Sequence, residues 1–105
     1  MAVITYNKLV RDKIPEIIEA DGKTCEIEIL SDEDYLKALD AKLDEELAEY
    51  HKDQNVEELA DLLEVIYACA EARGYSKEEL ESTREKKAKI RGEFGKKFFL
   101  KNVIE

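Results

Sequence analysis

Apolar residues recur at helical spacing along much of this 105-residue chain. The first clear run has its members three or four positions apart and consists of Leu36, Leu39, Leu43, Leu47 and Tyr50. This spacing predicts a long helix over residues 32–52. Ser31 precedes the run and Asp34 falls in its first turn, as is typical of a helix N-terminus.

A second apolar run predicts a helix that begins after Asn55 and ends at Gly74. Its main stripe consists of Leu59, Leu63, Ile66 and Ala70. Other faces of the same helix are also apolar, through Leu62, Val65, Ala68, Cys69 and Ala72. A helix that is apolar nearly all round is buried on more than one side. So short a chain has few elements to cover it, so we expect a homodimer, with a tetramer as the alternative assembly.

The remaining elements are shorter or weaker. Ser76 opens a third long helix that we expect to run to about Ile90, followed by a closing segment rich in phenylalanine. Near the N-terminus, Asp12 is expected to cap a short helix that ends near residues 21–22. Residues 25–29 alternate with period two, and a strand there would need a partner from residues 3–6 or from a second chain.

These elements predict an all-α fold, a helical bundle formed by a single domain over residues 1–105 and completed by homodimerisation, with at most a short strand near residues 25–29. Charged residues make up 41% of the chain and aromatic residues 8%, which suits a helical domain better than a β-sandwich. The net charge of −9 argues against stable binding of nucleic acid.

The charge is unevenly distributed along the sequence. Residues 84–101 carry eight Lys and Arg against two Glu, and the rest of the chain carries nine against twenty-four acids. An acidic body is therefore followed by a basic segment. Cys25 and Cys69 lack the spacing of a metal site and are interpreted as reduced thiols. With no signal-peptide pattern and no long apolar run, we expect a cytoplasmic protein that does not bind membranes.

Four carboxylates stand in mirror positions about residues 53–54: Glu46 and Glu49 before them, Glu58 and Asp61 after them. In an antiparallel helix hairpin, Glu49 would lie level with Glu58, and Glu46 with Asp61. The members of each pair are three residues apart, so they share one helix face and lie about 4.5 Å apart along the axis. Such carboxylates repel one another unless a cation neutralises them. We expect Mg²⁺, with Mn²⁺ as the alternative ion.

Few basic residues are placed to compensate these acids locally. The acids without a Lys or Arg four positions later are Glu45, Glu46, Glu57, Glu58 and Asp61. Only Lys42, four residues before Glu46, offers local compensation. The alternative interpretation is a solvated acidic helix face with no ion, which is common in a chain with 26 acids.

The pattern of these acids, E-E-x-x-E followed by E-x-x-D, resembles the signature of the all-α nucleoside triphosphate pyrophosphohydrolases, the MazG-like superfamily. The opening over residues 6–15, Y-N-K-L-V-R-D-K-I-P, is similar to the start of a small subgroup that resembles phosphoribosyl-ATP pyrophosphohydrolase. Residues 89–94, K-I-R-G-E-F, are similar to the ending of that subgroup. Together these matches span most of the chain.

The resemblance implies Mg²⁺-dependent cleavage between the α and β phosphates of a nucleotide, giving a monophosphate and pyrophosphate. The metal ligands would be Glu46, Glu49, Glu58 and Asp61. Glu45 would act with Glu46 and Glu49 in catalysis, by holding a further metal or orienting the attacking water. The substrates would be NTPs or dNTPs, including noncanonical ones, in a house-cleaning role. Only eight residues separate Glu49 from Glu58, which leaves little room for a loop over the substrate.

Basic residues are needed to meet the outer phosphates of such a substrate. The candidates for this role are Lys8, Arg11, Lys86, Lys89 and Arg91. The alternative for the lysines is that they complement the C-terminal end of a helix dipole. Arg91 is followed by Gly92, which lets backbone approach a ligand, and arginine grips phosphate through two donors.

Two other functions remain open from the sequence. One is hydrolysis of phosphoribosyl-ATP in histidine synthesis, which uses the same metal chemistry on a different substrate. The other is a non-catalytic helical dimer that acts as a regulatory or interaction module. The sequence has no P-loop and no Ser/His/Asp set, and its one histidine, His51, is interpreted as a surface residue.

Overall fold

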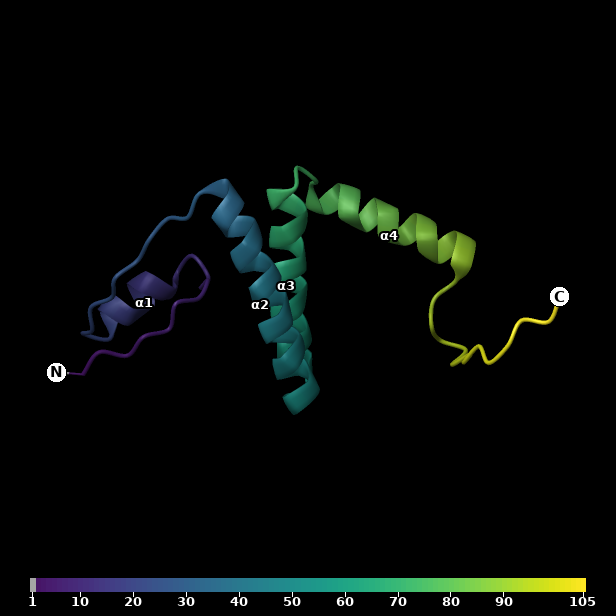
Figure 1. The fold of residues 1–105 in the computed structure, drawn as a ribbon, viewed down its shortest axis with the longest axis horizontal. Coiled ribbons are helices and arrows are strands. Elements are labelled where there is room, and N and C mark those ends of the chain that lie inside the picture. The colour runs from purple at the N-terminus through teal and green to yellow at the C-terminus, as the bar shows by residue number, and fades with distance from the viewer. Residues whose placement is uncertain (1) are drawn as a thin grey trace.

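The computed structural model describes residues 2–105 and contains four helices, with no strand among the described residues (Figure 1). They are α1 (Ile14–Ala20), α2 (Asp32–Asp53), α3 (Val56–Ala72) and α4 (Lys77–Arg91). The expectation of an all-helical chain is confirmed. No helix in this part of the chain has both the length and the apolarity needed to cross a membrane.

The helix boundaries follow from side-chain caps. Ser31 Oγ accepts a hydrogen bond from the backbone N–H of Asp34 at 3.2 Å, which opens α2. Asn55 Oδ1 accepts one from Glu58 N at 2.9 Å, which opens α3. Each cap satisfies a backbone donor that the first turn leaves without a partner. The same arrangement at Ser76 opens α4, so the predicted helix starts at Ser31, Asn55 and Ser76 are confirmed.

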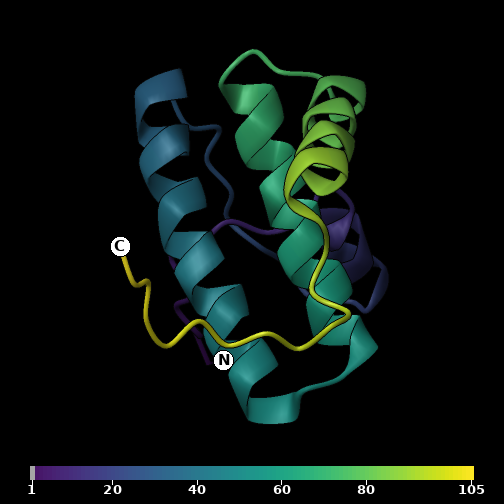
Figure 2. The same cartoon turned by 90° about the vertical axis from the view of Figure 1, so that its right-hand side faces the viewer.

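Helices α2 and α3 form an antiparallel hairpin and pack against each other (Figures 1 and 2). Gln54 allows the chain to reverse within two residues, because it takes a left-handed conformation with φ 50° and ends α2. The most buried apolar side chains of the described residues are Leu39 of α2 and Val65 of α3, with exposed fractions of 3% and 9%. These two residues mark the centre of the core.

The face that α3 turns toward α2 is not centred on its main apolar stripe. Leu62 is half-buried and Val65 is buried, whereas Leu59, Leu63 and Ile66 of the predicted main stripe are exposed. The buried stripe, with Leu62 and Val65, is displaced by three residues from the main stripe, so the two lie about 60° apart around the helix. Because α2 alone packs along α3, only one of the two stripes is covered in a single chain.

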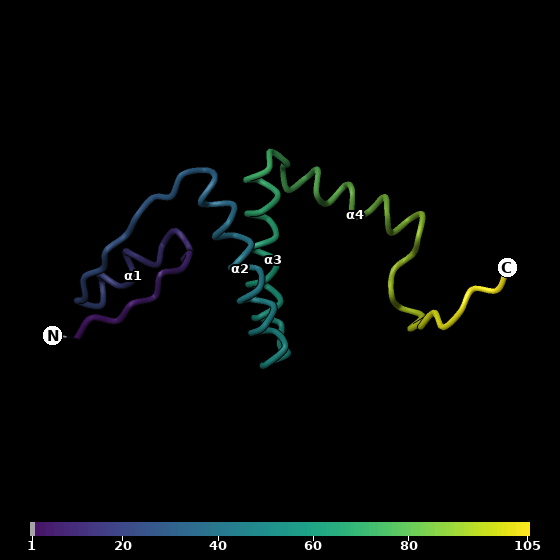
Figure 3. The backbone as a smooth tube through the Cα atoms, viewed as in Figure 1, coloured from purple at the N-terminus to yellow at the C-terminus, as the bar shows by residue number. Residues whose placement is uncertain are grey.

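Helix α4 leaves the far end of α3 and projects away from the hairpin (Figures 1 and 3). Gly74 permits the corner between them, since its φ of 90° is disfavoured for residues with a side chain. Lys77 Nζ then lies 4.0 Å from Glu71 Oε1 and 5.2 Å from the centre of the Tyr67 ring. These contacts lie at the corner from which α4 starts.

Residues 25–29 form no strand within the described part of the chain, which agrees with the expectation of at most a short strand there. One prediction about the N-terminal third is corrected. Asp12 does not cap α1: the N-cap position is Lys13, which makes no capping hydrogen bond, and Pro15 falls in the first turn. Proline needs no partner for its nitrogen and has a fixed φ, so a short helix can begin there without a cap.

We expect Leu39→Ala to lower the free energy of unfolding by about 2–4 kcal/mol, because it opens a cavity at the most buried position of the hairpin. Urea unfolding followed by circular dichroism at a fixed protein concentration measures this. Lys37→Ala on the exposed side of the same helix is the control and should change the value by less than about 0.5 kcal/mol. Equal effects of the two substitutions would contradict this assignment of the core.

Candidate metal centre

The hairpin brings acidic side chains of α2 and α3 together in two overlapping groups. Glu46, Glu58 and Asp61 each offer a carboxylate oxygen, and these oxygens lie within 4.8 Å of one another. Glu49, Asp53 and Glu58 do the same in a second group. Glu58 belongs to both groups. All four carboxylates predicted from the sequence are therefore placed in these groups, and their role as metal ligands stays a prediction.

The register of the hairpin explains this convergence. Asn55 caps α3, so Glu58 stands in the first turn of that helix, beside the last turns of α2. Glu46, Glu49 and Asp53 follow at spacings of three and four, which keeps them on one side of α2. The first group is half-buried, whereas Glu49 and Asp53 of the second are exposed.

Asp53 was not among the predicted site residues. The sequence placed it in the turn, because the helix was expected to end at residue 52. The structure extends α2 by one residue, so Asp53 lies one helical turn after Glu49 and near Glu58. The spacing of four from Glu49 was the signal that could have identified it.

The donor atoms of the two groups are of the type that binds a hard divalent cation. Every donor is a carboxylate oxygen, the type that Mg²⁺ and Mn²⁺ prefer. Ligands of an octahedral Mg²⁺ lie about 2.1 Å from the ion, so pairs of them are about 3–4.2 Å apart. Oxygens within 4.8 Å of one another come close to this range, and small side-chain rotations would close the difference.

Repulsion between the clustered carboxylates affects the ionisation of Glu58. Partial burial, followed by the carboxylates of Asp53, Asp61, Glu49 and Glu46, raises the pKa of Glu58 above its ordinary value. Each neighbour disfavours its ionised form. A bound cation would act in the opposite direction and favour that form.

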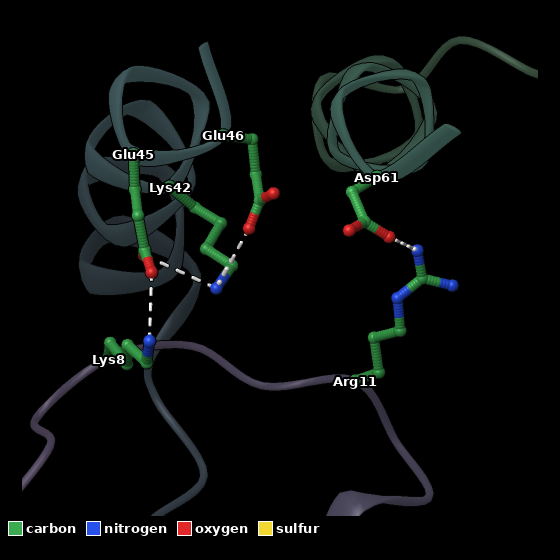
Figure 4. Close-up of polar contacts among 6 residues, drawn as sticks. All are labelled: Lys8, Arg11, Lys42, Glu45, Glu46 and Asp61. Carbon is green, nitrogen blue, oxygen red and sulfur yellow. Dashed lines mark hydrogen bonds and ion pairs between the residues drawn. The ribbon is translucent and has the colours of Figure 1, made fainter. Parts of the chain in front are cut away.

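Lysines partly neutralise Glu46 of the first group and its neighbour Glu45 (Figure 4). Lys42 Nζ lies 3.3 Å from Glu46 Oε1 and 3.3 Å from Glu45 Oε2. Lys8 donates a hydrogen bond to Glu45 Oε1 at 2.8 Å, and this contact, helped by Lys42, lowers the pKa of Glu45. Glu45 is thus held ionised beside Glu46, outside both carboxylate groups.

The N-terminal segment before α1 reaches both helices of the hairpin (Figure 4). Lys8 contacts α2 through Glu45, and Arg11 Nη2 donates to Asp61 Oδ1 of α3 at 2.6 Å. Two predicted phosphate-binding residues therefore lie at the acidic site. In this structure their partners are carboxylates of the site itself, including one predicted metal ligand.

The C-terminal candidates are placed elsewhere. Lys86, Lys89 and Arg91 lie exposed on α4, which starts from the end of α3 opposite the hairpin turn (Figure 1). From Glu58 to the end of α3 is about 21 Å along the helix axis. Within one chain the structure does not bring these three residues to the acidic site.

Comparison with known proteins adds one partial relative. An uncharacterized protein of Mycolicibacterium smegmatis is 64% identical over 42 residues, which cover 40% of this chain and 43% of that protein. The match thus spans less than half of either protein. No protein family model matches the chain, and no solved structure matches it. The geometry of the site is therefore the main basis for an inference about function.

We expect Glu58→Gln to raise the melting temperature at pH 7 in the presence of EDTA. The folded-state pKa of Glu58 is raised, so its ionisation costs stability at pH values above that pKa, and the cost disappears as the pH falls through it. The gain from glutamine should therefore shrink between pH 7 and pH 4. Thermal melts across this range measure it.

Glu57→Gln is the matched control, because Glu57 also lies in the first turn of α3 but belongs to neither carboxylate group. Both substitutions remove the same interaction with the helix dipole. If Glu58→Gln is no more stabilising than Glu57→Gln at pH 7, carboxylate repulsion at this site is absent.

Proposed function

We propose that this protein is a Mg²⁺-dependent nucleotide pyrophosphohydrolase that cleaves the bond between the α and β phosphates of NTPs or dNTPs. The observation that carries the proposal is the pair of overlapping carboxylate groups, which share Glu58 and have basic residues at their edge. The resemblance of the acidic motif and of the chain's opening and closing sequences to the MazG-like superfamily supports the same reaction.

The first requirement of this reaction is a place for metal ions beside a polyphosphate. Glu46, Glu49, Glu58 and Asp61 would hold the metal, with Asp53 as a fifth carboxylate in reach. A bound Mg²⁺ would neutralise phosphate oxygens and lower the pKa of a bound water. Because carboxylates on two packed helices supply the donors, their backbone positions are set before the substrate arrives, and side-chain rotations would complete the site.

The second requirement is a group that orients or activates the attacking water. Glu45 fits this role because it stands next to Glu46 but lies outside both carboxylate groups. A carboxylate that is ionised at neutral pH can accept a hydrogen bond from the water, and Lys8, followed by Lys42, lowers the pKa of Glu45 in this structure. Lys8 would have to release Glu45 for this role, and the half-exposed setting of this ion pair makes such an exchange inexpensive.

The third requirement is positive charge for the phosphates that leave. Lys8 and Arg11 belong to one segment that reaches both helices of the site. Phosphate oxygens would offer Arg11 an acceptor in place of Asp61, which would be shared with the metal, and would offer Lys8 an acceptor in place of Glu45. We therefore infer that Lys8 and Arg11 exchange their carboxylate partners for the substrate's phosphates when metal and nucleotide bind.

The expected role is the removal of surplus or noncanonical nucleotides in the cytoplasm. Phosphoribosyl-ATP, which has the same bond in a different nucleotide, is the alternative substrate. The short connection between α2 and α3 leaves no loop beside the carboxylates to cover a base. Selection of the base would then depend on other parts of the protein.

Incubation with a panel of NTPs, dNTPs and phosphoribosyl-ATP in the presence of Mg²⁺, with detection of pyrophosphate, tests the proposal. We expect turnover of at least one nucleotide that stops when EDTA is added. Glu49→Gln and Asp61→Asn should each lower turnover by at least ~100-fold, because they remove carboxylates that would hold the metal.

Glu57→Gln is the control and should retain turnover within a few-fold of the original protein. Circular dichroism of each variant establishes that the helices are retained. Activity that survives both Glu49→Gln and Asp61→Asn would place the reaction at another site. No turnover of any nucleotide, with full helical content, would contradict the proposed function and favour the non-catalytic module.

A further inference from the structure

A single copy of this chain leaves far more surface in water than a folded domain of its size. Its accessible surface is 9981 Å² for a mass of 12.1 kDa. A compact monomer of that mass exposes about 6,000 Å². The radius of gyration is 18.5 Å, against about 13 Å for a compact chain of 105 residues. A single chain therefore exposes about 4,000 Å² more surface than a compact monomer of its mass.

Exposed apolar side chains occur in the N-terminal third, on the hairpin and in the C-terminal part of the chain, and the last two surfaces are the ones that differ in charge. Of these two, one lies on the hairpin and includes Leu47, Leu59, Leu63 and Ile66. The other is the segment of residues 84–101, which we call the C-terminal segment. Its exposed apolar residues are Ile90, Phe94, Phe98, Phe99 and Leu100. Large exposed apolar areas of this kind mark an interaction surface.

The charges of the two surfaces are opposite. On the hairpin, exposed Leu47 follows Glu46 and exposed Leu59 follows Glu58, so each leucine lies about 100° around its helix from an acid and borders the acidic surface. The C-terminal segment carries eight Lys and Arg against two Glu, interleaved with its phenylalanines. An apolar and basic segment thus complements an apolar and acidic face.

The two surfaces of one chain do not meet, because α4 leads away from the hairpin. At the corner between α3 and α4, Lys77 contacts Glu71 and Tyr67, and the backbone N–H of Tyr75 donates a hydrogen bond to the carbonyl oxygen of Ala70 at 2.9 Å. The tail then continues apart from the turn between α2 and α3 (Figure 3). A second copy is the occupant that carries both complementary surfaces at once, and two such contacts close a symmetric dimer.

We propose that the C-terminal segment of one chain docks on the acidic and apolar face of the α2–α3 hairpin of a second copy. Each chain of an obligate dimer buries about 1,000–2,500 Å², which the additional exposed surface easily supplies. The docked segment brings Lys86, Lys89 and Arg91 toward the acidic site of the other chain. Their use there as phosphate ligands rests on the proposed function, whereas the docking itself does not.

Zero-length cross-linking of mixed ¹⁴N- and ¹⁵N-labelled chains tests this arrangement without any assay of activity. The two preparations are unfolded, mixed and refolded together, then treated with a carbodiimide that joins a lysine amine to a carboxylate in contact with it. We expect mixed-isotope peptides that join a lysine of residues 84–101 to a carboxylate of residues 44–61. Sedimentation should give twice the mass of one chain.

The triple variant K86Q/K89Q/R91Q should weaken the dimer by at least ~10-fold at low salt, because it removes half of the net positive charge of the C-terminal segment. All three residues are exposed, so the helices should be retained. The control K13Q/K23Q/K37Q removes the same charge outside this segment and should change the dissociation constant by less than about threefold.

A monomer at micromolar concentrations would overturn the proposal. A dimer whose C-terminal cross-links all join residues of the same isotope would also overturn it, since the segment would then fold back on its own chain. So would a dimer with no cross-links from that segment. Turnover of nucleotides in any of these cases would leave the proposed function standing, and trans cross-links without turnover would leave the docking standing.

Discussion

The packing of α2 against α3 is the contact on which the rest of this structure depends. Leu39 and Val65 are buried between the two helices, and the two-residue reversal at Gln54 sets their register. That register places acids of both helices side by side. The hydrophobic contact therefore enforces an electrostatic arrangement that is unfavourable by itself, as the raised pKa of Glu58 indicates.

Basic residues from two parts of the chain form ion pairs with the acids of the hairpin. Lys42 compensates from within α2, and Lys8 and Arg11 compensate from the N-terminal segment. The ion pairs of Lys8 and Arg11 are half-exposed, so each can be exchanged for another partner at small cost, whereas the pair of Lys42 with Glu46 is mostly buried. A divalent cation and a phosphate chain would together provide such partners, and this is why the arrangement is suited to binding a metal with a nucleotide.

Much of the secondary structure could be predicted from the sequence because it depends on local signals. Ser31, Asn55 and Ser76 each cap the helix that the hydrophobic spacing predicts. The convergence of Glu46 with Glu58 and Asp61 follows from the same spacing once a hairpin is assumed. Asp53 was missed because it depends on a single additional residue of α2, and helix ends are less certain than helix centres.

The packing of the helices and the contacts between distant residues were harder to predict from the sequence. Helix α3 has two apolar stripes, and the sequence does not indicate which of them α2 covers; the structure buries Val65 and leaves Leu63 exposed. The alternation in residues 25–29 is compatible with a strand, but strand formation requires a partner that no local pattern specifies. The contacts of Lys8 and Arg11 join residues 37 and 50 positions apart, and no spacing rule predicts them.

Titration of the protein with Mn²⁺, followed by electron paramagnetic resonance of the free ion, tests most directly whether the carboxylates of the hairpin form a metal site. Glu58 is common to both carboxylate groups. The account predicts saturable binding that Glu58→Gln weakens by at least ~10-fold and Glu57→Gln leaves nearly unchanged. Absence of binding at millimolar Mn²⁺, or equal binding by both variants, would contradict it.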